Sequence, residues 1–425
     1  MNFYVVLGLV VSALRPVVLV GVWGSIWSAQ AQSLSTDFQR AQQHDSTYAA
    51  ALIENEAGKL QARIASMAYF PEARVSLSQL DNESSSRTTI SISQPILSYD
   101  RWLGLKEADP RMAMAAVKME QSQLELARRL FKVVAALVEA RVKLALNVSS
   151  LQALETQAVA ARSSYQLGMG TITDVRDTEV RLAQTKSQSF SLKASLSAAE
   201  REYVSVVGQA PLAGAYPLTK VVSPWRLPAL AEFLERTEQR SLGVRAAELS
   251  VSLAEIAARR ARAVLYPSVA AFAQGSQVGG NPASSNAGIA LRMEIPLQAG
   301  TLFKGSAADL DLSKTQELVR NTILQVRLDV GRLYSQVEAG QSELGVRAEA
   351  IKAAELSLEA NEQSFKGGVR TKVDVLNALQ ALFLTRSDYS SAQLRLGESL
   401  LGLLVVSSED AGAILKQVQD RIFSE

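Results

Sequence analysis

The stretch GMGTITDV (residues 168–175) returns 200 positions later as GVRTKVDV (residues 368–375). Both copies keep a glycine first, a threonine fourth, and the pair Asp-Val at the end, as Asp174-Val175 and Asp374-Val375. Each copy lies between long segments with few helix-breaking residues, so each is predicted to be a turn between two helices. Identical residues also stand 200 positions apart beyond the turns: Leu182, Thr185, Ser187 and Leu196 match Leu382, Thr385, Ser387 and Leu396. The chain is therefore predicted to be an internal duplication.

The duplication extends upstream of the turns. The segment MAYFPEARVSLS (67–78) is similar to AVLYPSVAAFAQ (263–274), and TISISQPILSYD (89–100) is similar to LRMEIPLQAGTL (291–302). We predict two structural repeats, 32–226 and 227–425, each with a helix, a β-hairpin and a pair of long helices. The hairpins are expected at about 72–95 and 267–297, and the turns at the helix tips at 166–174 and 366–374.

Composition excludes several kinds of site. The 425 residues contain no Cys and one His, so disulfides, thiolate metal sites and sites built on several histidines are excluded. A net charge of +2 gives no bulk attraction to nucleic acid. No phosphate-binding loop and no nucleophile elbow occurs. We therefore expect no enzyme activity, no cofactor and no bound metal.

Residues 1–31 have the character of a secretory signal peptide. The segment is apolar and ends in Ala29-Gln30-Ala31, a small-x-small cleavage pattern. The alternative is an N-terminal membrane anchor, but Arg15-Pro16 interrupts the apolar run and makes it a poor membrane span. We expect an exported chain.

Four segments alternate apolar and polar residues. In three of them the apolar positions are clear: Val75 and Leu77, Ile90 and Ile92, and Ile289, Leu291, Met293 and Ile295. In the fourth, Val269–Gln274, the residues are too small to show which face is apolar. Each segment has the length of a transmembrane β-strand. Because open sheet edges are not tolerated in lipid, strands that cross a membrane would have to be pooled from several chains. The alternative is a pair of surface hairpins on a soluble domain.

The helical segments are long. Residues 99–165 and 301–365 could each reach roughly 100 Å at 1.5 Å per residue. A coiled-coil seam is predicted in the first of them by the spacing of Leu130, Val134, Leu137, Leu144, Val148 and Leu151.

The duplicated order, the two G-x-x-T-x-x-D-V turns, and the strand ends QPIL (94–97) and EIPL (294–297) resemble TolC-like outer-membrane efflux proteins. The resemblance implies an α+β membrane protein, a homotrimer in the bacterial outer membrane. Each chain would give four strands to a 12-stranded β-barrel, continued by an α-helical coiled-coil barrel through the periplasm. Residues expected to face the water-filled bore are Arg74, Ser91, Arg292 and Glu294. The outer loops would be Asp81–Ser86 and Val278–Asn286, and about 205–240 and the end after Ser407 would form a belt.

The resemblance also implies a constriction at the periplasmic tips. It falls on Thr173, Asp174, Asp177, Phe365, Arg370, Asp374 and Asn377. The family usually has Tyr where Phe365 stands and Asp where Asn377 stands, and Asp177 offers the missing charge. We expect Arg370, with a carboxylate of a neighbouring helix, to hold the end closed, so that Arg370→Ala changes channel conductance. The alternative role for the two aspartates is helix capping, with Thr171 or Thr173, and Thr371, as N-caps.

The function implied is a passive exit duct of a tripartite efflux or type I secretion system. A periplasmic adaptor would dock on the tips, and an inner-membrane ABC or RND-type transporter would supply energy. The tip residues expected to bind the adaptor are Leu167, Gly168, Met169, Gly170, Gly367, Gly368 and Val369. The alternative is a periplasmic coiled-coil scaffold that forms no channel. Whether the cargo is a drug, a peptide, a protein or a metal is not indicated.

Overall fold

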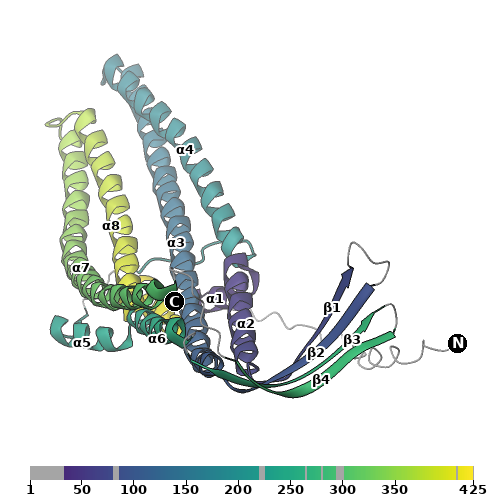
Figure 1. Ribbon diagram of the computed structural model, residues 1–425. Coiled ribbons are helices and arrows are strands. Elements are labelled where there is room, and N and C mark those ends of the chain that lie inside the picture. Colours follow the sequence, from purple (N-terminus) through teal and green to yellow (C-terminus); the bar gives the residue numbers. More distant parts are fainter. Residues whose placement is uncertain are drawn as a thin grey trace, which may run out of the picture.

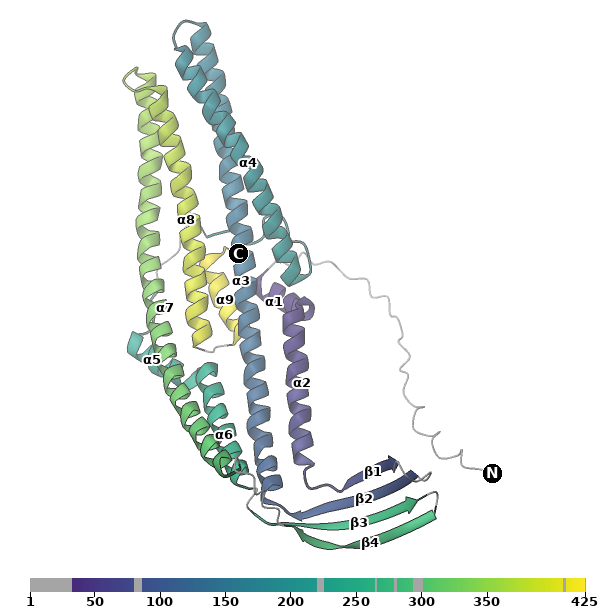
Figure 2. The same cartoon turned by 45° about the horizontal axis from the view of Figure 1, so that its top comes forward.

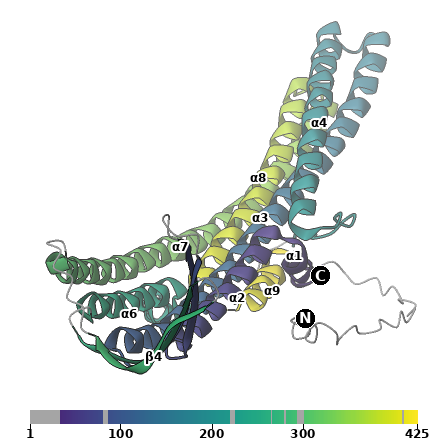
Figure 3. The same cartoon turned by 45° about the vertical axis from the view of Figure 1, so that its right-hand side comes forward.

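The computed structural model describes residues 33–79, 86–219, 225–263, 266–278, 281–292, 301–407 and 410–424. The elements follow in the order α1 (Leu34–His44), α2 (Ser46–Ser66), β1 (Glu72–Gln79), β2 (Ser86–Leu97), α3 (Tyr99–Gln166), α4 (Ile172–Val207), α5 (Leu230–Arg240), α6 (Leu242–Ala263), β3 (Ser268–Val278), β4 (Asn281–Arg292), α7 (Thr301–Lys366), α8 (Lys372–Val406) and α9 (Ala411–Ile422). The sheet projects from one end of the molecule, and the helical hairpins α3–α4 and α7–α8 extend to the other (Figures 1 and 3).

The four strands form one antiparallel sheet in the order β1-β2-β3-β4. The register aligns Arg74, Ser91, Gln274 and Asn286 in one polar row across all four strands. The opposite face carries exposed apolar side chains: Val75, Leu77, Ile90, Ile92, Ile289 and Leu291. The alternation predicted from the sequence therefore makes one face polar and one apolar, and β3, ambiguous in sequence, places Phe272 and Gln274 on the polar face.

The bounds expected for the second outer loop, Val278–Asn286, are wrong. The strand β3 continues to Val278 and β4 begins at Asn281, so Asn281–Asn286 belong to β4. Small polar residues can form this strand because the backbone groups of β4 pair with those of β3. The hydroxyls of Ser276 on β3 and Ser284 on β4 also hydrogen-bond to each other at 2.8 Å. The expected signal peptide, residues 81–85, the side chain of Arg292, and residues 293–295 lie outside the described parts of the chain.

Four helices lie side by side and continue the four strands. Figure 2 shows them in the order α2, α3, α6, α7, which matches the strand order. The helices α2 and α7 are the two edges of this layer, and α4 and α8 pack on α3 and α7. The helix α3 has 68 residues, about 100 Å by helical rise. None of the described helices is apolar over a stretch long enough to cross a membrane.

The seam predicted along α3 is only half buried. Leu130, Val134 and Leu137 are fully enclosed, but Val148 is 41% exposed. The first three pack in the core with residues of α8 and α9. Farther toward the tip α3 packs on α4, and the residues buried there are Leu154, Ala158 and Ala161 instead of members of the predicted seam.

The core lies at mid-length, where a C-terminal segment closes around α3 and α8. Phe423 pairs with Leu218 in an isolated β-bridge. The buried Gln393 of α8 donates its amide to the carbonyl oxygens of Thr219 and Ile422 at 3.1 and 3.0 Å. The helix α9 contacts α1, α3 and α8, whereas α5 packs on α6 and α7. These segments include the two that the resemblance assigns to a belt.

A buried ion pair fastens the start of the chain to α3. Asp45 caps α2 by accepting a hydrogen bond from the Tyr48 N–H at 2.7 Å, and Arg129 donates both Nη atoms to its carboxylate at 2.7 and 3.0 Å. Burial by itself would raise the pKa of Asp45, but the hydrogen bonds from Arg129 and Tyr48 outweigh it and hold the pKa below its usual value.

Arg129→Met is expected to lower the free energy of unfolding at pH 7 by about 1–3 kcal/mol, because Asp45 stays buried without its cation. A lowered carboxylate pKa stabilises the fold above the unfolded value of about 3.9, and this stabilisation is lost as the pH falls through the folded value. The difference between the proteins should therefore shrink in thermal melts below about pH 4. Arg128→Met is the matched control, since Arg128 reaches Glu125 only at 4.0 Å. An equal loss in both variants would contradict the role of the Asp45 pair.

Candidate functional site

The two helical tips repeat the same backbone turn. Met169 N–H donates to the Ser164 carbonyl and Val369 N–H to the Ser364 carbonyl, each at 2.9 Å. Gly168 and Gly368 have φ of 71° and 74°, the left-handed region that glycine reaches without a Cβ penalty. The paired glycines of the sequence thus end α3 and α7 in the same way.

The aspartates that occur in both turns, Asp174 and Asp374, cap the helices that follow. Thr171 and Thr371 are the N-caps, and each accepts a hydrogen bond from the backbone N–H of the Asp three residues later, at 3.1 and 3.3 Å. Asp174 and Asp374 return the bond by accepting the threonine N–H at 3.1 and 2.9 Å. Thr173 is an exposed residue within α4 and caps nothing. Capping, the alternative offered for these aspartates, is therefore present in both turns.

This capping holds the pKa of Asp374 below its usual range, because the Thr371 N–H and hydroxyl both donate to its carboxylate. The carboxylate is therefore ionised in the resting turn. In each turn the carboxylate oxygen that accepts the threonine N–H is Oδ2 of the aspartate.

The second tip carries a cation placed over an aromatic ring. Lys372 Nζ lies 4.9 Å from the centroid of the Phe365 ring. Burial lowers the pKa of Lys372, and the negative charges of Glu362 and Asp174 oppose the shift. Since Asp174 belongs to the first tip, the two tips are coupled electrostatically. Phe365 thus makes a contact with Lys372 that needs no hydroxyl.

An arginine that the sequence did not single out joins the two helical hairpins. Arg181 of α4 donates to Asn377 Oδ1 at 2.7 Å and to Gln380 Oε1 at 3.2 Å, both on α8. We call these three residues the Arg181 clamp. Arg181 lies two turns after Asp174 on the same helix face, a spacing that could have marked it, but its counterpart in the second repeat is Ala381. Of the expected constriction residues, only Asn377 belongs to the clamp.

Other expected constriction residues have no such link. Arg370 is exposed, and within the described chain no carboxylate lies within 4.0 Å of its guanidinium, so its expected partner would have to come from a neighbouring subunit. Asp177 is half-buried on α4.

Each hairpin is stiffened by its own ion pairs. Glu179 of α4 bonds Arg162 of α3 at 2.7 Å and Arg176 at 2.8 Å, and these bonds lower the pKa of Glu179. In the second hairpin Arg386 of α8 bonds Glu355 of α7 at 2.7 Å. Each hairpin is thus tied internally, while the clamp is a contact between hairpins.

A cavity of about 490 Å³ lies beside the clamp, between the first hairpin and α8. Its lining includes Lys143 and Asn147 of α3, Arg181 of α4, and Leu376 and Phe383 of α8. The hairpins are therefore incompletely packed next to the clamp, which leaves room for relative movement.

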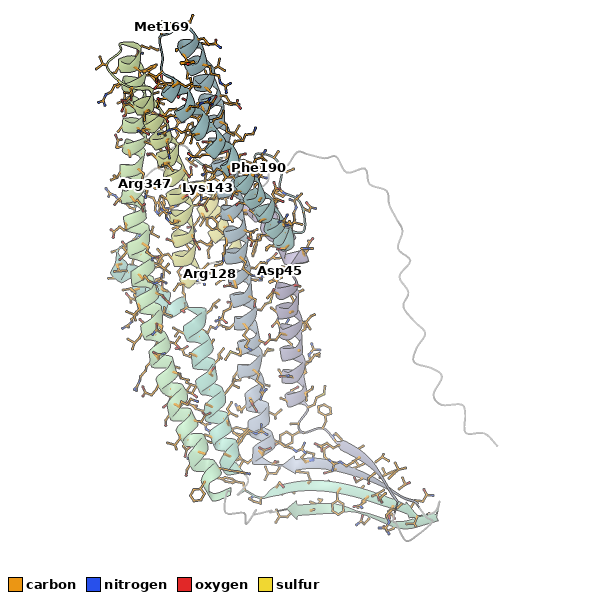
Figure 4. The ribbon with its side chains drawn as sticks, turned by 90° about the horizontal axis from the view of Figure 1, so that it is seen from above. Asp45, Arg128, Lys143, Met169, Phe190 and Arg347 are labelled. Atoms are coloured by element: carbon orange, nitrogen blue, oxygen red, sulfur yellow. The ribbon has the colours of Figure 1, made fainter. Side chains whose placement is uncertain are left out.

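The tips themselves are apolar. Leu167, Met169 and Val369 are 70%, 74% and 82% exposed, and Met169 lies at the free end of the first hairpin (Figure 4). Exposed apolar side chains at a rigid helical end are suited to contact another protein. Among the described residues no group of three metal-binding side chains is found.

Comparison with known proteins matches this architecture. The family model described as outer membrane efflux protein matches residues 38–209 and 233–406, one stretch in each repeat. The chain belongs to this family. It is 23% identical over 406 residues to the proteases secretion protein PrtF of Dickeya chrysanthemi, covering 88% of each chain. It is 24% identical over 319 residues to the outer membrane protein TolC of Vibrio cholerae, covering 72% of each.

Solved structures agree on the fold. The CmeC outer membrane channel of Campylobacter jejuni matches with a TM-score of 0.75 and 11% identity over 94% of both chains. The outer membrane protein VceC of Vibrio cholerae matches with a TM-score of 0.72 and 16% identity, over 88% of this chain and 96% of its own. Because the chain belongs to the outer membrane efflux protein family, it is an outer-membrane protein of a transport family, and its helices extend into the periplasm.

Proposed function

We propose that three copies of this chain form the exit duct of a tripartite efflux or type I secretion system. The observation that carries the proposal is that one layer has two open edges with complementary surfaces. At the sheet, β1 and β4 are the open edges, and below it the edges are α2 and α7. An open sheet edge is not stable in lipid, and closure into a barrel removes it.

The helical edges carry apolar stripes with coiled-coil spacing. On α2 the stripe consists of the exposed residues Ile53, Leu60 and Ile64 and of Met67 directly after the helix, and on α7 it consists of the exposed residues Phe303, Leu310, Leu324 and Leu328. The spacings of 7, 4 and 3 on α2, and of 7, 14 and 4 on α7, keep each stripe on one face. Each large apolar side chain buried between subunits contributes about 1.5–3 kcal/mol. The pairing of α2 with α7 of the next subunit follows from the same closure that pairs β1 with β4.

The partners follow from the tips and from the relatives. Two relatives are named for the secretion of proteases, and a third is named for efflux. We propose that a periplasmic adaptor docks on Leu167, Met169 and Val369 and links the duct to an inner-membrane ABC or RND-type transporter. The residues assigned from sequence to the constriction would line the end that this docking opens, and the Arg181 clamp would hold it closed.

The proposed trimer can be tested by cross-linking introduced cysteines, because the chain has no cysteine of its own. Leu60→Cys on α2 and Leu310→Cys on α7 are introduced together, and membranes are treated with a flexible bis-maleimide. We expect bands at two and three times the monomer mass on denaturing gels. The control pairs Leu310→Cys with Val159→Cys, an exposed residue far along α3. A detergent-free, water-soluble monomer that shows no cross-link would exclude the duct and favour the scaffold alternative.

A further inference from the structure

Exposed aromatic residues stand where the strands join the helices. Phe70 precedes β1, Trp102 follows β2 and Tyr266 precedes β3, and their side chains are 65%, 42% and 58% exposed. The ring of Tyr99 lies between two of them, with centroids 5.8 Å from Trp102 and 5.0 Å from Tyr266. Aromatic residues of this kind gather where a membrane meets water. The strand–helix junction is therefore the level of the lipid headgroups.

The helix layer has one concave side, marked by a cavity of about 570 Å³ that all four helices line. On α3 its lining includes Glu107 and Arg111, and on α2 it includes Glu54. At 100° per residue, Lys106 lies about 100° and Trp102 about 140° around α3 from Glu107, and Arg63 lies about 180° around α2 from Glu54. Trp102, Lys106 and Arg63 are therefore turned away from the bore, toward the surroundings of the barrel.

Two of these residues bring positive charge to the junction. Lys106 Nζ lies 5.5 Å from the Trp102 ring centroid, and Arg63 is in the last turn of α2. Both are exposed, and no carboxylate in the described chain lies within 4.0 Å of either. Side chains on a helix lean toward its N-terminus, which for α3 is the sheet, so Lys106 leans toward the membrane. The exposed Asp109 lies one turn farther from the sheet.

We propose that Trp102 and Lys106 form a binding site for the phosphate headgroup of an anionic phospholipid in the periplasmic leaflet, and that Arg63 on the neighbouring helix α2 adds positive charge to the same junction. The ring packs on the glycerol region, and Lys106 pairs with the phosphate. Each Lys or Arg near an anionic surface strengthens binding about fivefold. The inference rests on the barrel proposed above, and it adds a lipid preference that a barrel alone does not require.

The test uses Trp102 as its own reporter. The chain has four Trp, so the triple variant W23F/W27F/W225F keeps only Trp102. The purified protein is reconstituted in equal mixtures of phosphatidylglycerol and phosphatidylcholine, with bromine on the acyl chains of one lipid or of the other. We expect stronger quenching of Trp102 fluorescence by brominated phosphatidylglycerol, corresponding to severalfold enrichment. Adding Arg63→Ala and Lys106→Ala should equalise the two lipids, whereas Lys193→Ala on α4 should change nothing.

The outcomes separate this site from the duct. Equal quenching by both lipids in the protein with Arg63 and Lys106 intact would overturn the headgroup site but leave the barrel in place. A preference that survives the double substitution would also overturn it, because the cations would then not select the lipid. Absence of quenching by either lipid would remove both the site and the proposed membrane position.

Discussion

Replacing Arg181 with alanine is expected to raise the conductance of the resting duct severalfold in planar lipid bilayers. The substitution removes hydrogen bonds of 2.7 and 3.2 Å between α4 and α8. An exposed contact of this kind contributes about 0.5–1.5 kcal/mol. Three copies act on one opening, so the sum of roughly 1.5–4.5 kcal/mol corresponds to about a ten- to thousandfold change in the open-to-closed ratio. The cavity beside the clamp gives the freed hairpin room to move.

Two further variants identify the clamp as the cause. Asn377→Ala with Gln380→Ala removes both acceptors and should reproduce the conductance of Arg181→Ala, with no further increase when all three are combined. Arg176→Ala is the matched control, because Arg176 bonds Glu179 of its own helix. If Arg181→Ala conducts like the unmodified protein while Arg370→Ala opens the channel, the end is held closed by Arg370 and a carboxylate of a neighbouring helix, as predicted from the sequence, and the clamp is only structural.

Asp37→Ala is expected to destabilise the mid-length core by about 3–5 kcal/mol. Asp37 of α1 is fully buried, and its carboxylate accepts hydrogen bonds from the hydroxyls of Tyr203 and Tyr216 and pairs with Arg40 at 3.1 Å. Each buried hydrogen bond to a charged acceptor is worth about 1.5–3 kcal/mol. Tyr216 has φ of 60°, a strained conformation for a residue with a side chain, and the bond to Asp37 helps to hold it.

Thermal unfolding of the reconstituted protein measures the loss. Asp388→Ala is the control. Its carboxylate is exposed, and its ion pair with Arg347 is weak because the two groups are 3.5 Å apart. A melting temperature for Asp37→Ala equal to that of the control would show that the tyrosine hydroxyls find other acceptors, and that the cluster does not stabilise the core.

The same cluster predicts sensitivity to alkali. Burial, together with the adjacent charge of Asp37, raises the pKa of both tyrosines well above the usual value. A raised pKa gives stability that is complete below the unfolded value of about 10 and is lost as the pH rises above it, by about 1.4 kcal/mol per pH unit for each tyrosine. Thermal melts of Tyr203→Phe with Tyr216→Phe should therefore depend less steeply on pH above 10 than those of the unmodified protein.

Local patterns in the sequence predict, in each repeat, the hairpin and the two long helices joined by a turn, but not the short helices α1, α5 and α9. Repetition of the Gly-x-x-Thr-x-x-Asp-Val turn fixes two helical tips, because glycine ends one helix and the Thr-Asp box begins the next. Alternation in Val75, Leu77, Ile90 and Ile92 fixes a sheet with one apolar face, since side chains on a strand point to opposite sides. These signals are local, with periods of a few residues, and so they can be read along the chain.

Contacts between residues far apart in the sequence follow from the packing of the elements and could not be predicted from local patterns. Arg181 and Asn377 are 196 positions apart, and Asp37 meets Tyr203 across 166 positions. Neither pair is marked by a local sequence pattern. The internal repeat does not predict the clamp either, because Ala381 occupies the position that corresponds to Arg181. The outward positions of Lys106 and Arg63 likewise depend on which helix faces enclose the concave side. Helix packing sets these meetings, and packing depends on the side chains of several elements at once.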